Sequence, residues 1–192
     1  MRNYLNFLLV RGFYELAYYT WLQFLPSDRL GSMGLLFNGT FETQASGLPF
    51  DWTISAGRGA TAELLPIPDG GGRQGLRIAF TEGRVQFGGV EQAVLIPQGR
   101  YVLSGRLRGG IEGKRGLRWR VNCLGNPVRL LAESPMHLGP VAEWERFELE
   151  FEIPADCLMQ QVRLDHDARS PSEQLARGTL WYADMAIRRR QE

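Results

Sequence analysis

Residues 147–153 read FELEFEI, and this stretch decides the fold class of the chain. Apolar side chains occupy every second position, and three glutamates occupy the positions between them. Because successive side chains of an extended strand point to opposite faces, this pattern predicts a strand with one face in a core and the other in solvent. Residues 101–108 and 117–123 alternate in the same way.

Most of the chain after residue 33 continues this period of two. Turn signals separate the segments, such as Gly109-Gly110 and Gly125-Asn126-Pro127. Many short strands at this spacing predict an all-β sandwich or jelly roll over residues 31–192. The expected strands are residues 35–38, 50–55, 61–65, 76–81, 90–96, 101–108, 117–123, 128–133, 145–153, 161–167 and 180–188.

The first 30 residues differ, because apolar residues recur there with helical spacing. Arg11-Gly12 predicts a break into two short helices, and Pro26-Ser27 predicts the end of the second. Both faces are apolar, so we expect residues 4–25 to contact a second copy or another part of a parent chain as well as the sandwich. Charged residues interrupt the run and no small-residue cleavage site follows, so we expect neither a membrane span nor an export signal.

Composition excludes several function classes. The formal charge of +1 gives no bulk electrostatic attraction to nucleic acid, so we expect no nucleic-acid partner. Cys123 and Cys157 are the two cysteines, and they form either one disulfide or two buried thiols. A disulfide would imply an oxidising compartment, which points to the periplasm or the extracellular space. Neither His137 nor His166 stands in a zinc motif or beside a nucleophile signature, so we expect no enzyme.

Four further stretches, in order along the chain, resemble carbohydrate-binding modules of the family 4/9/22 kind. These stretches are LFNGTFE at 36–42, PFDW at 49–52, EQAVLIPQGRYVLS at 91–104 and WYAD at 181–184. The resemblance implies a galactose-binding-like jelly roll over about residues 35–188. Residues 13–25 are also similar, more loosely, to the second helix of a tetratricopeptide repeat, which implies that residues 1–30 end a helical-repeat region. The alternative is a helix pair packed on its own sandwich.

The resemblance implies two facing sheets. One would hold residues 76–81, 180–188, 101–108 and 145–153, and the other 90–96, 161–167, 117–123 and 128–133. In such modules the outward face of the second sheet, or the loops at one end, carries the sugar. On the first sheet, the outward Glu148, Glu150 and Glu152 would form cross-strand ion pairs with Arg106 and Arg108, so catalytic carboxylates are not needed to explain them.

The outward face of that second sheet is rich in arginine. Guanidinium groups recognise carboxylates in bidentate fashion and hydrogen-bond to sugar hydroxyls, so this face predicts glycan binding, with a preference for acidic glycans. The alternative is a surface network in which these side chains satisfy one another. Phe87, in a glycine-containing loop, is the candidate for an exposed aromatic ring that stacks on a sugar. The candidate binding residues are Arg118, Arg120, Asn122, Arg129, Arg163, Asp165 and Phe87.

A single structural calcium ion is a further expectation from the resemblance, because family members often hold calcium near their first and last strands. Glu42 and Asp184 match those positions, and carboxylate oxygens suit this ion. Asp184 could instead cap the backbone at Asn38-Gly39. Together these features predict a non-catalytic glycan-binding module within a larger bacterial-type protein, with acidic polysaccharide as the expected ligand. The alternative is a scaffolding sandwich that caps a helical-repeat array and binds no sugar.

Overall fold

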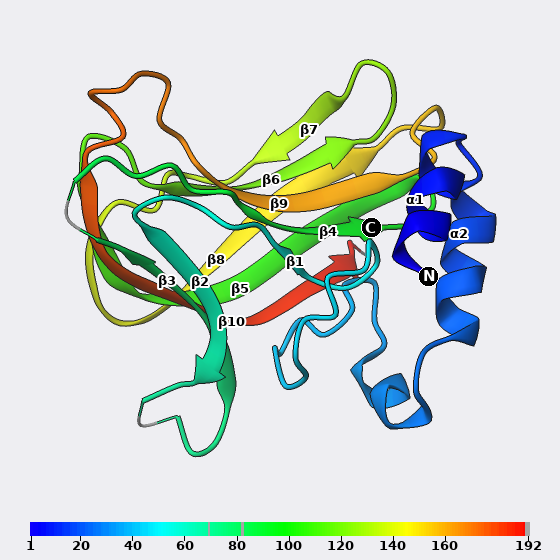
Figure 1. The fold of residues 1–192 in the computed structure, drawn as a ribbon, viewed down its shortest axis with the longest axis horizontal. Coiled ribbons are helices and arrows are strands. Elements are labelled where there is room, and N and C mark those ends of the chain that lie inside the picture. Colours follow the sequence, from blue (N-terminus) through cyan, green and yellow to red (C-terminus); the bar gives the residue numbers. More distant parts are fainter. Residues whose placement is uncertain (69, 82, 191–192) are drawn as a thin grey trace.

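The chain forms a sandwich of two antiparallel sheets with a pair of helices at one end (Figure 1). This arrangement comes from a computed structural model, which describes residues 1–68, 70–81 and 83–190. The helices are α1 (Arg2–Val10) and α2 (Tyr14–Gln23), and a short 3-10 helix, η1 (Ser27–Ser32), follows them. Within the described residues, no helix is both long enough and apolar enough to cross a membrane.

Each sheet has five strands, and we name each sheet after its central strand. The β9 sheet has the order β1 (Thr53–Ile54), β4 (Val90–Val94), β9 (Gln160–His166), β6 (Leu117–Cys123) and β7 (Arg129–Glu133). The β10 sheet has the order β2 (Ala60–Pro66), β3 (Gln74–Phe80), β10 (Ala176–Arg189), β5 (Gly99–Gly113) and β8 (Gly139–Ile153). The two predicted sets of four strands are confirmed, and so is the jelly-roll sandwich.

The core lies between the two sheets and is built from the alternating residues that the sequence pattern indicated. Phe147 and Phe151 of β8 are buried, whereas Glu148 between them is exposed. Trp119 of the β9 sheet meets Tyr182 of the β10 sheet with ring centroids 5.4 Å apart. Removing these large apolar side chains from water drives the two faces together.

The predicted strand at residues 35–38 is wrong, and that at residues 50–55 shrinks to the two residues of β1. Here side chains bond the local backbone and replace a strand ladder. Asn38 adopts a φ of +50°, donates to the Thr43 carbonyl at 2.8 Å and accepts from the Thr43 amide at 3.1 Å. The carboxylate of Asp51 accepts the backbone N–H groups of Ser46 (2.8 Å) and Trp52 (2.7 Å).

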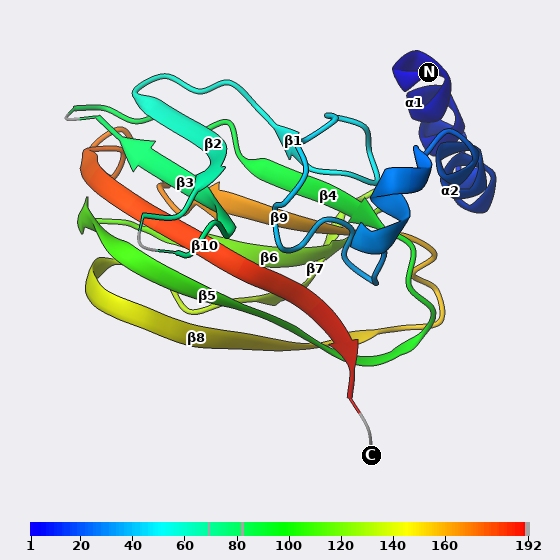
Figure 2. The same ribbon diagram turned by 90° about the horizontal axis from the view of Figure 1, so that it is seen from below.

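The helix pair packs against the end of the sandwich (Figure 2). The break at Arg11-Gly12 is confirmed, and Gly12 there has a φ of +77°. Trp21 is 2% exposed and contacts the rings of Phe37 and Phe50, with centroids 5.1 and 5.6 Å away. The helices therefore share a core with residues of the sandwich. This is the arrangement expected for a helix pair that packs on its own sandwich. The tetratricopeptide-repeat resemblance stays a prediction.

Cys123 and Cys157 form a disulfide, the first of the two alternatives left open by the sequence. Their Cα atoms lie 5.7 Å apart. The bond joins the last residue of β6 to the connection between β8 and β9. It therefore ties two segments together at one rim of the β9 sheet.

Candidate functional site

The outward face of the β9 sheet carries the charged side chains that the sequence placed there. Trp119 and Val121 of β6, like Val162 and Leu164 of β9, point into the core and are fully buried. Because neighbours in a strand point oppositely, Arg118, Arg120, Asn122, Arg163 and Asp165 lie together on the outer side. Strand register sets Arg118 opposite Asp165 and Arg120 opposite Arg163.

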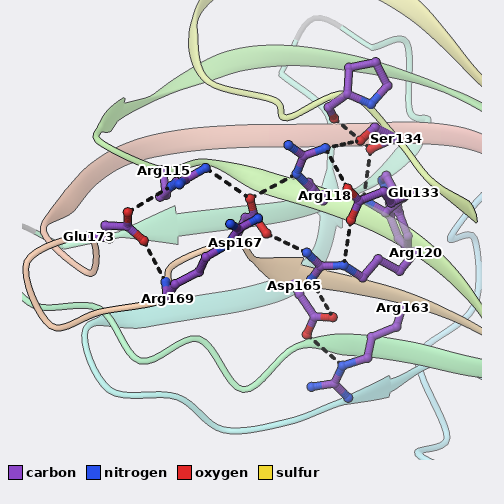
Figure 3. Close-up of polar contacts among 12 residues, drawn as sticks. Arg115, Arg118, Arg120, Glu133, Ser134, Arg163, Asp165, Asp167, Arg169 and Glu173 are labelled. Atoms are coloured by element: carbon purple, nitrogen blue, oxygen red, sulfur yellow. Dashed lines mark hydrogen bonds and ion pairs between the residues drawn. The ribbon is translucent and has the colours of Figure 1, made fainter. Parts of the chain in front are cut away.

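Asp167 is the centre of this face, and the sequence analysis missed it (Figure 3). Its side chain is 4% exposed and accepts from Arg118 Nε at 3.1 Å and from Arg120 Nη2 at 2.5 Å. Arg115 lies 3.6 Å away. Burial alone raises the pKa of Asp167, but the hydrogen bonds from Arg120 and Arg118 outweigh it, so the pKa lies below its usual value. The alternation Arg163, Asp165, Asp167 was the signal that could have found it.

Arg118 and Arg120 have further carboxylate partners, and Arg163 is paired as well. Glu133 lies 3.4 Å from Arg118 and 3.2 Å from Arg120. Asp165 lies 3.5 Å from Arg120 and accepts from Arg163 Nε at 2.7 Å, and Arg163 also pairs with Glu91. The arrangement corresponds to the mutually satisfied network that the sequence left open as the alternative.

Two further predicted residues lie apart from that charged network. Asn122 is the next outward residue after Arg120 on β6, and it donates to the side-chain oxygen of Gln161 at 3.3 Å. Arg129 forms a bidentate pair with Asp156 at 2.9 and 3.1 Å on the exposed edge. Asn122 therefore extends the face toward the helices, whereas Arg129 belongs to a separate pair.

A groove of about 350 Å³ continues the face toward α1. Leu9 and Asn6 of α1 form one wall, and Gln161 of β9 and Glu91 of β4 form the other. A second cavity of about 510 Å³ shares Arg2 and Gly47 with it. Amide and carboxylate groups beside apolar side chains are what a small-molecule site requires, because a few polar groups orient a ligand that the apolar surface covers.

Phe87 is not the exposed ring that the sequence predicted. It is half-buried, it packs against the core between the sheets, and its ring centroid lies 5.7 Å from that of Phe80. Its loop pairs with residue Arg58 through the adjacent Gln86, which folds the loop onto the sandwich. A stacking role for Phe87 stays a prediction that would require the ring to leave this contact.

The predicted calcium residues do not offer a free pair of carboxylates. Asp184 forms ion pairs with Arg106 and, at 3.8 Å, with Arg73. Glu42 is exposed, and residues 1–68, 70–81 and 83–190 contain no cluster of three His, Cys, Asp or Glu side chains suited to a metal. Two guanidiniums around one carboxylate compete with a divalent cation. The sequence left open that the Asp184 side chain caps the backbone at Asn38-Gly39. The Gly39 carbonyl instead accepts from the backbone amide of Met185 at 2.9 Å.

The glutamates of β8 form ion pairs, but not with the predicted partners. Glu148 lies 3.6 Å from Arg146, Glu152 lies 3.9 Å from Arg100, and Glu150 pairs with Arg190. Arg106 and Arg108 were the wrong partners because the register sets Glu148 opposite Ser104 and Glu150 opposite Val102. The glutamates are nevertheless paired, as a structural role requires.

His137 is a buried group rather than a catalytic base. Its Nδ1 lies 2.7 Å from the hydroxyl of Tyr182, and its Nε2 is buried without a hydrogen-bond partner among the described residues. Burial, and then the charge of Arg118, lower the pKa of His137 to about 4. His166 points to the core side of β9 and its Nε2 lies 3.1 Å from the Arg115 carbonyl.

Comparison with known proteins identifies the fold. No protein-family model matches the chain, and no curated protein matches it. Among solved structures, a family 4 carbohydrate-binding module matches with a TM-score of 0.54 at 14% identity, over 81% of this chain and 99% of that one. A xylan-binding domain, CBM22-1, from Paenibacillus barcinonensis matches with a TM-score of 0.51 at 13% identity, over 80% of this chain and 93% of that one.

Two other matches mark the range of these similarities. A protein from Bacteroides thetaiotaomicron with a provisional assignment as sugar-binding matches with a TM-score of 0.57 at 10% identity, over 82% of this chain and 100% of that one. An α-L-arabinofuranosidase, MgGH51, matches with a TM-score of 0.51 at 18% identity, over 81% of this chain but only 26% of that one. The sandwich described here therefore has the jelly-roll fold of carbohydrate-binding modules.

Proposed function

We propose that the chain is a non-catalytic glycan-binding module. One observation carries the proposal: the sandwich corresponds to binding modules over nearly their whole length, 99% of the family 4 module and 93% of the xylan-binding domain. Where the match is an enzyme such as MgGH51, it spans only a quarter of that chain. A module of this kind works as part of a larger protein, and the disulfide suits an oxidising compartment.

The outward face of the β9 sheet and the groove beside α1 are the proposed binding region. Asn122 and Gln161 supply amide donors and acceptors, which match the hydroxyl groups of a sugar. Leu9, Ala93 and the other apolar groups of the groove suit the C–H faces of the ring. The groove volume of about 350 Å³ falls at the lower end of ligand sites, which suits one or two sugar units.

Preference for an acidic glycan is the finer part of this proposal. On the β9 sheet, each of Arg118, Arg120 and Arg163 already holds a protein carboxylate. A glycan carboxylate would therefore have to displace Asp165 or Glu133 from these guanidiniums, which costs the pairs that it replaces. Binding driven by such an exchange would weaken as salt rises, because exposed charges are screened.

A glycan array on the purified chain tests the function, and a paired variant tests the region. Asn122→Ala with Gln161→Ala removes the amide pair of the face, and we expect at least tenfold weaker binding, because each lost hydrogen bond is worth about 1 kcal/mol. Gln23→Ala with Gln98→Ala is the matched control, because both residues are exposed and neither lines the groove. Absence of binding to every glycan, with the fold intact by circular dichroism, would contradict the proposal.

A second candidate function is protein interaction through the helix pair. Large apolar side chains of α1 and α2 face solvent, among them Val10 (86% exposed) and Tyr19 (60% exposed). Exposed apolar patches of this kind mark interaction surfaces. A silent array would favour this function, and binding of a purified helical-repeat protein that Tyr19→Ser abolishes would support it.

Calcium binding is a separate proposal with a direct test. If Glu42 and Asp184 hold the ion, calcium raises the melting temperature relative to a chelator, and Asp184→Asn removes the difference. Equal melting temperatures in calcium and chelator would exclude a structural calcium ion.

A further inference from the structure

Trp181 lies on the outer face of the β10 sheet, on the opposite side of the molecule from the charged network. Its neighbours Leu180 and Tyr182 are buried in the core, so the half-buried Trp181 side chain points outward. The register of β10 sets Trp181 opposite Arg108 of β5 on one side and opposite Arg77 of β3 on the other. Figure 2 shows β10 between β3 and β5.

Trp144 of β8 lies on the same outer face. Arg106 points outward, because its neighbours Gly105 and Leu107 are buried. Its guanidinium carbon lies over the Trp144 ring, 5.5 Å from the ring centroid. The β5–β8 register shifts between the pairs Leu107–Glu145 and Gly109–Val141, so Trp144 is one of the three residues of β8, 142–144, that face Arg108. Neighbouring strands are about 4.8 Å apart, so the two tryptophans flank Arg108 at a separation of roughly 10 Å.

Arg108 differs in its pairing from the neighbouring arginines Arg77 and Arg106 of this face. Arg77 pairs with Glu63 at 3.4 Å, and Arg73 and Arg106 share Asp184. The side chain of Arg108 makes no ion pair or hydrogen bond to any residue in the described part of the chain. No carboxylate among the described residues therefore balances the charge of Arg108.

We propose that Trp144, Arg108 and Trp181 form a binding row for an acidic glycan that crosses strands β8, β5 and β10. The apolar face of one sugar stacks on each indole ring, and the Arg108 guanidinium binds a uronic-acid carboxylate between them. The strands that carry the two rings lie roughly 10 Å apart, a distance comparable to about two sugar units of an extended glycan chain. This inference rests on the proposed glycan-binding function and gives the acidic preference a different location.

The location of the five tryptophans makes this row visible in solution. Trp21, Trp52 and Trp119 are 2%, 0% and 0% exposed, whereas Trp144 and Trp181 are both half-buried. A ligand on the row therefore changes the tryptophan fluorescence and shields it from an aqueous quencher such as acrylamide. A ligand confined to the β9 face leaves the fluorescence of both accessible rings unchanged.

The experiment is a fluorescence titration of the purified chain with an oligogalacturonate and with a neutral galactose oligomer of equal length. We expect the oligogalacturonate to bind at least tenfold more tightly and to protect tryptophan from the quencher. Arg108→Gln should remove that preference, and Trp181→Ala should weaken binding about tenfold, the equivalent of about 1.4 kcal/mol. Trp181→Phe keeps an aromatic ring and should retain most of the affinity.

Matched controls separate this row from bulk charge and from loss of fold. Arg188→Gln removes an exposed arginine farther along β10, and Phe24→Ala removes an exposed aromatic ring of the helical end. Both should bind as the unchanged chain does, with an unchanged melting temperature. If the chain binds glycans but Trp181→Ala and Arg108→Gln bind equally well, the row is excluded and the proposed function stands. If the chain binds no glycan, both fall, and equal binding of the neutral oligomer excludes the acidic preference.

Discussion

At the scale of single residues, Asp167 organises the outer face of the β9 sheet. Arg118 and Arg120 both donate to a carboxylate that is 4% exposed. Replacing Asp167 by Ala leaves these guanidiniums without their common partner, so we expect a loss of about 2–3 kcal/mol in the free energy of unfolding. Urea denaturation followed by circular dichroism measures this loss.

Asp156→Ala is the control for that measurement, because it removes an equally charged partner from an exposed pair. Asp156 is 68% exposed and Arg129 is 49% exposed. Exposed pairs of this kind contribute little, so we expect a much smaller change than for Asp167→Ala. Equal losses for Asp167→Ala and Asp156→Ala would show that burial of the network has no energetic consequence.

His137 makes stability depend on pH. Its pKa is about 4 in the folded chain because the ring is buried beside Tyr182 and Arg118, against an ordinary 6.5. Below pH 6.5 the unfolded chain binds a proton that the folded chain does not, so stability present above pH 6.5 falls as the pH drops toward 4. The free energy of unfolding is lower by about 3 kcal/mol once the pH lies below both pKa values.

Urea denaturation at pH 7.5 and pH 4.5, with and without His137→Gln, measures this contribution. The variant should lose less stability on acidification than the unchanged chain. An identical pH dependence in both proteins would mean that His137 is not the group responsible.

At this residue scale, the sequence predicted which side chains point outward better than it predicted their ion-pair partners. The outward orientation of Arg118, Arg120 and Arg163 follows from alternation with buried neighbours, which a single strand reveals. Their pairing with Asp167 and Glu91 depends on which strands are adjacent and in what register, and a single strand does not contain that information. Arg108 shows the same limit, since its predicted glutamate partners lie several register positions away.

At the scale of elements, Trp21 is the largest of the buried side chains that join the helix pair to the sandwich. Trp21 contacts Phe37, Phe50 and Tyr18, with ring centroids between 5.1 and 5.8 Å away. Trp21→Ala should lower the free energy of unfolding by about 3–5 kcal/mol, because it leaves a cavity in a packed core. Thermal unfolding by calorimetry measures the change, and Tyr19→Ala, on the exposed side of the same helix, should cost far less.

A large loss for Trp21→Ala accompanied by a single transition would mean that the helices and the sandwich unfold together. Persistence of the sandwich transition at its original temperature would instead make the helix pair an independent unit. Amide exchange across α1 and α2 then distinguishes the two cases residue by residue.

The elements that the sequence predicted correctly are those with a clean period. The long strands, the helix break and the sheet membership of eight strands follow from alternation, helical spacing and the family resemblance. Residues 35–38 and 50–55 are predicted as strands from the same period of two, and the structure does not bear this out for 35–38 and leaves two residues of 50–55. Asn38 and Asp51 carry the competing signal, since short polar side chains that bond the backbone favour loops over ladders.

At the scale of the whole molecule, the exposed apolar residues of α1 and α2 predict association. Phe7, Phe13, Leu16, Tyr19 and Phe24 are each more than half exposed. A protein that presents these side chains together gains free energy by covering them. Sedimentation velocity should therefore show dimers that grow with concentration, and Phe7→Ser with Tyr19→Ser should restore the monomer. A monomer at every concentration would contradict this prediction.

The disulfide also determines how the molecule responds to tension. When the two ends of the chain are pulled apart, the force acts along the backbone. Cys123 and Cys157 are separated by 34 positions in sequence, so the segment between them is shielded from the pulling force. Reduction would release roughly 110 Å of additional contour length, at about 3.4 Å per residue. The bond thus limits the reach of the unravelled chain, because residues 124–156 cannot be extended while it is intact.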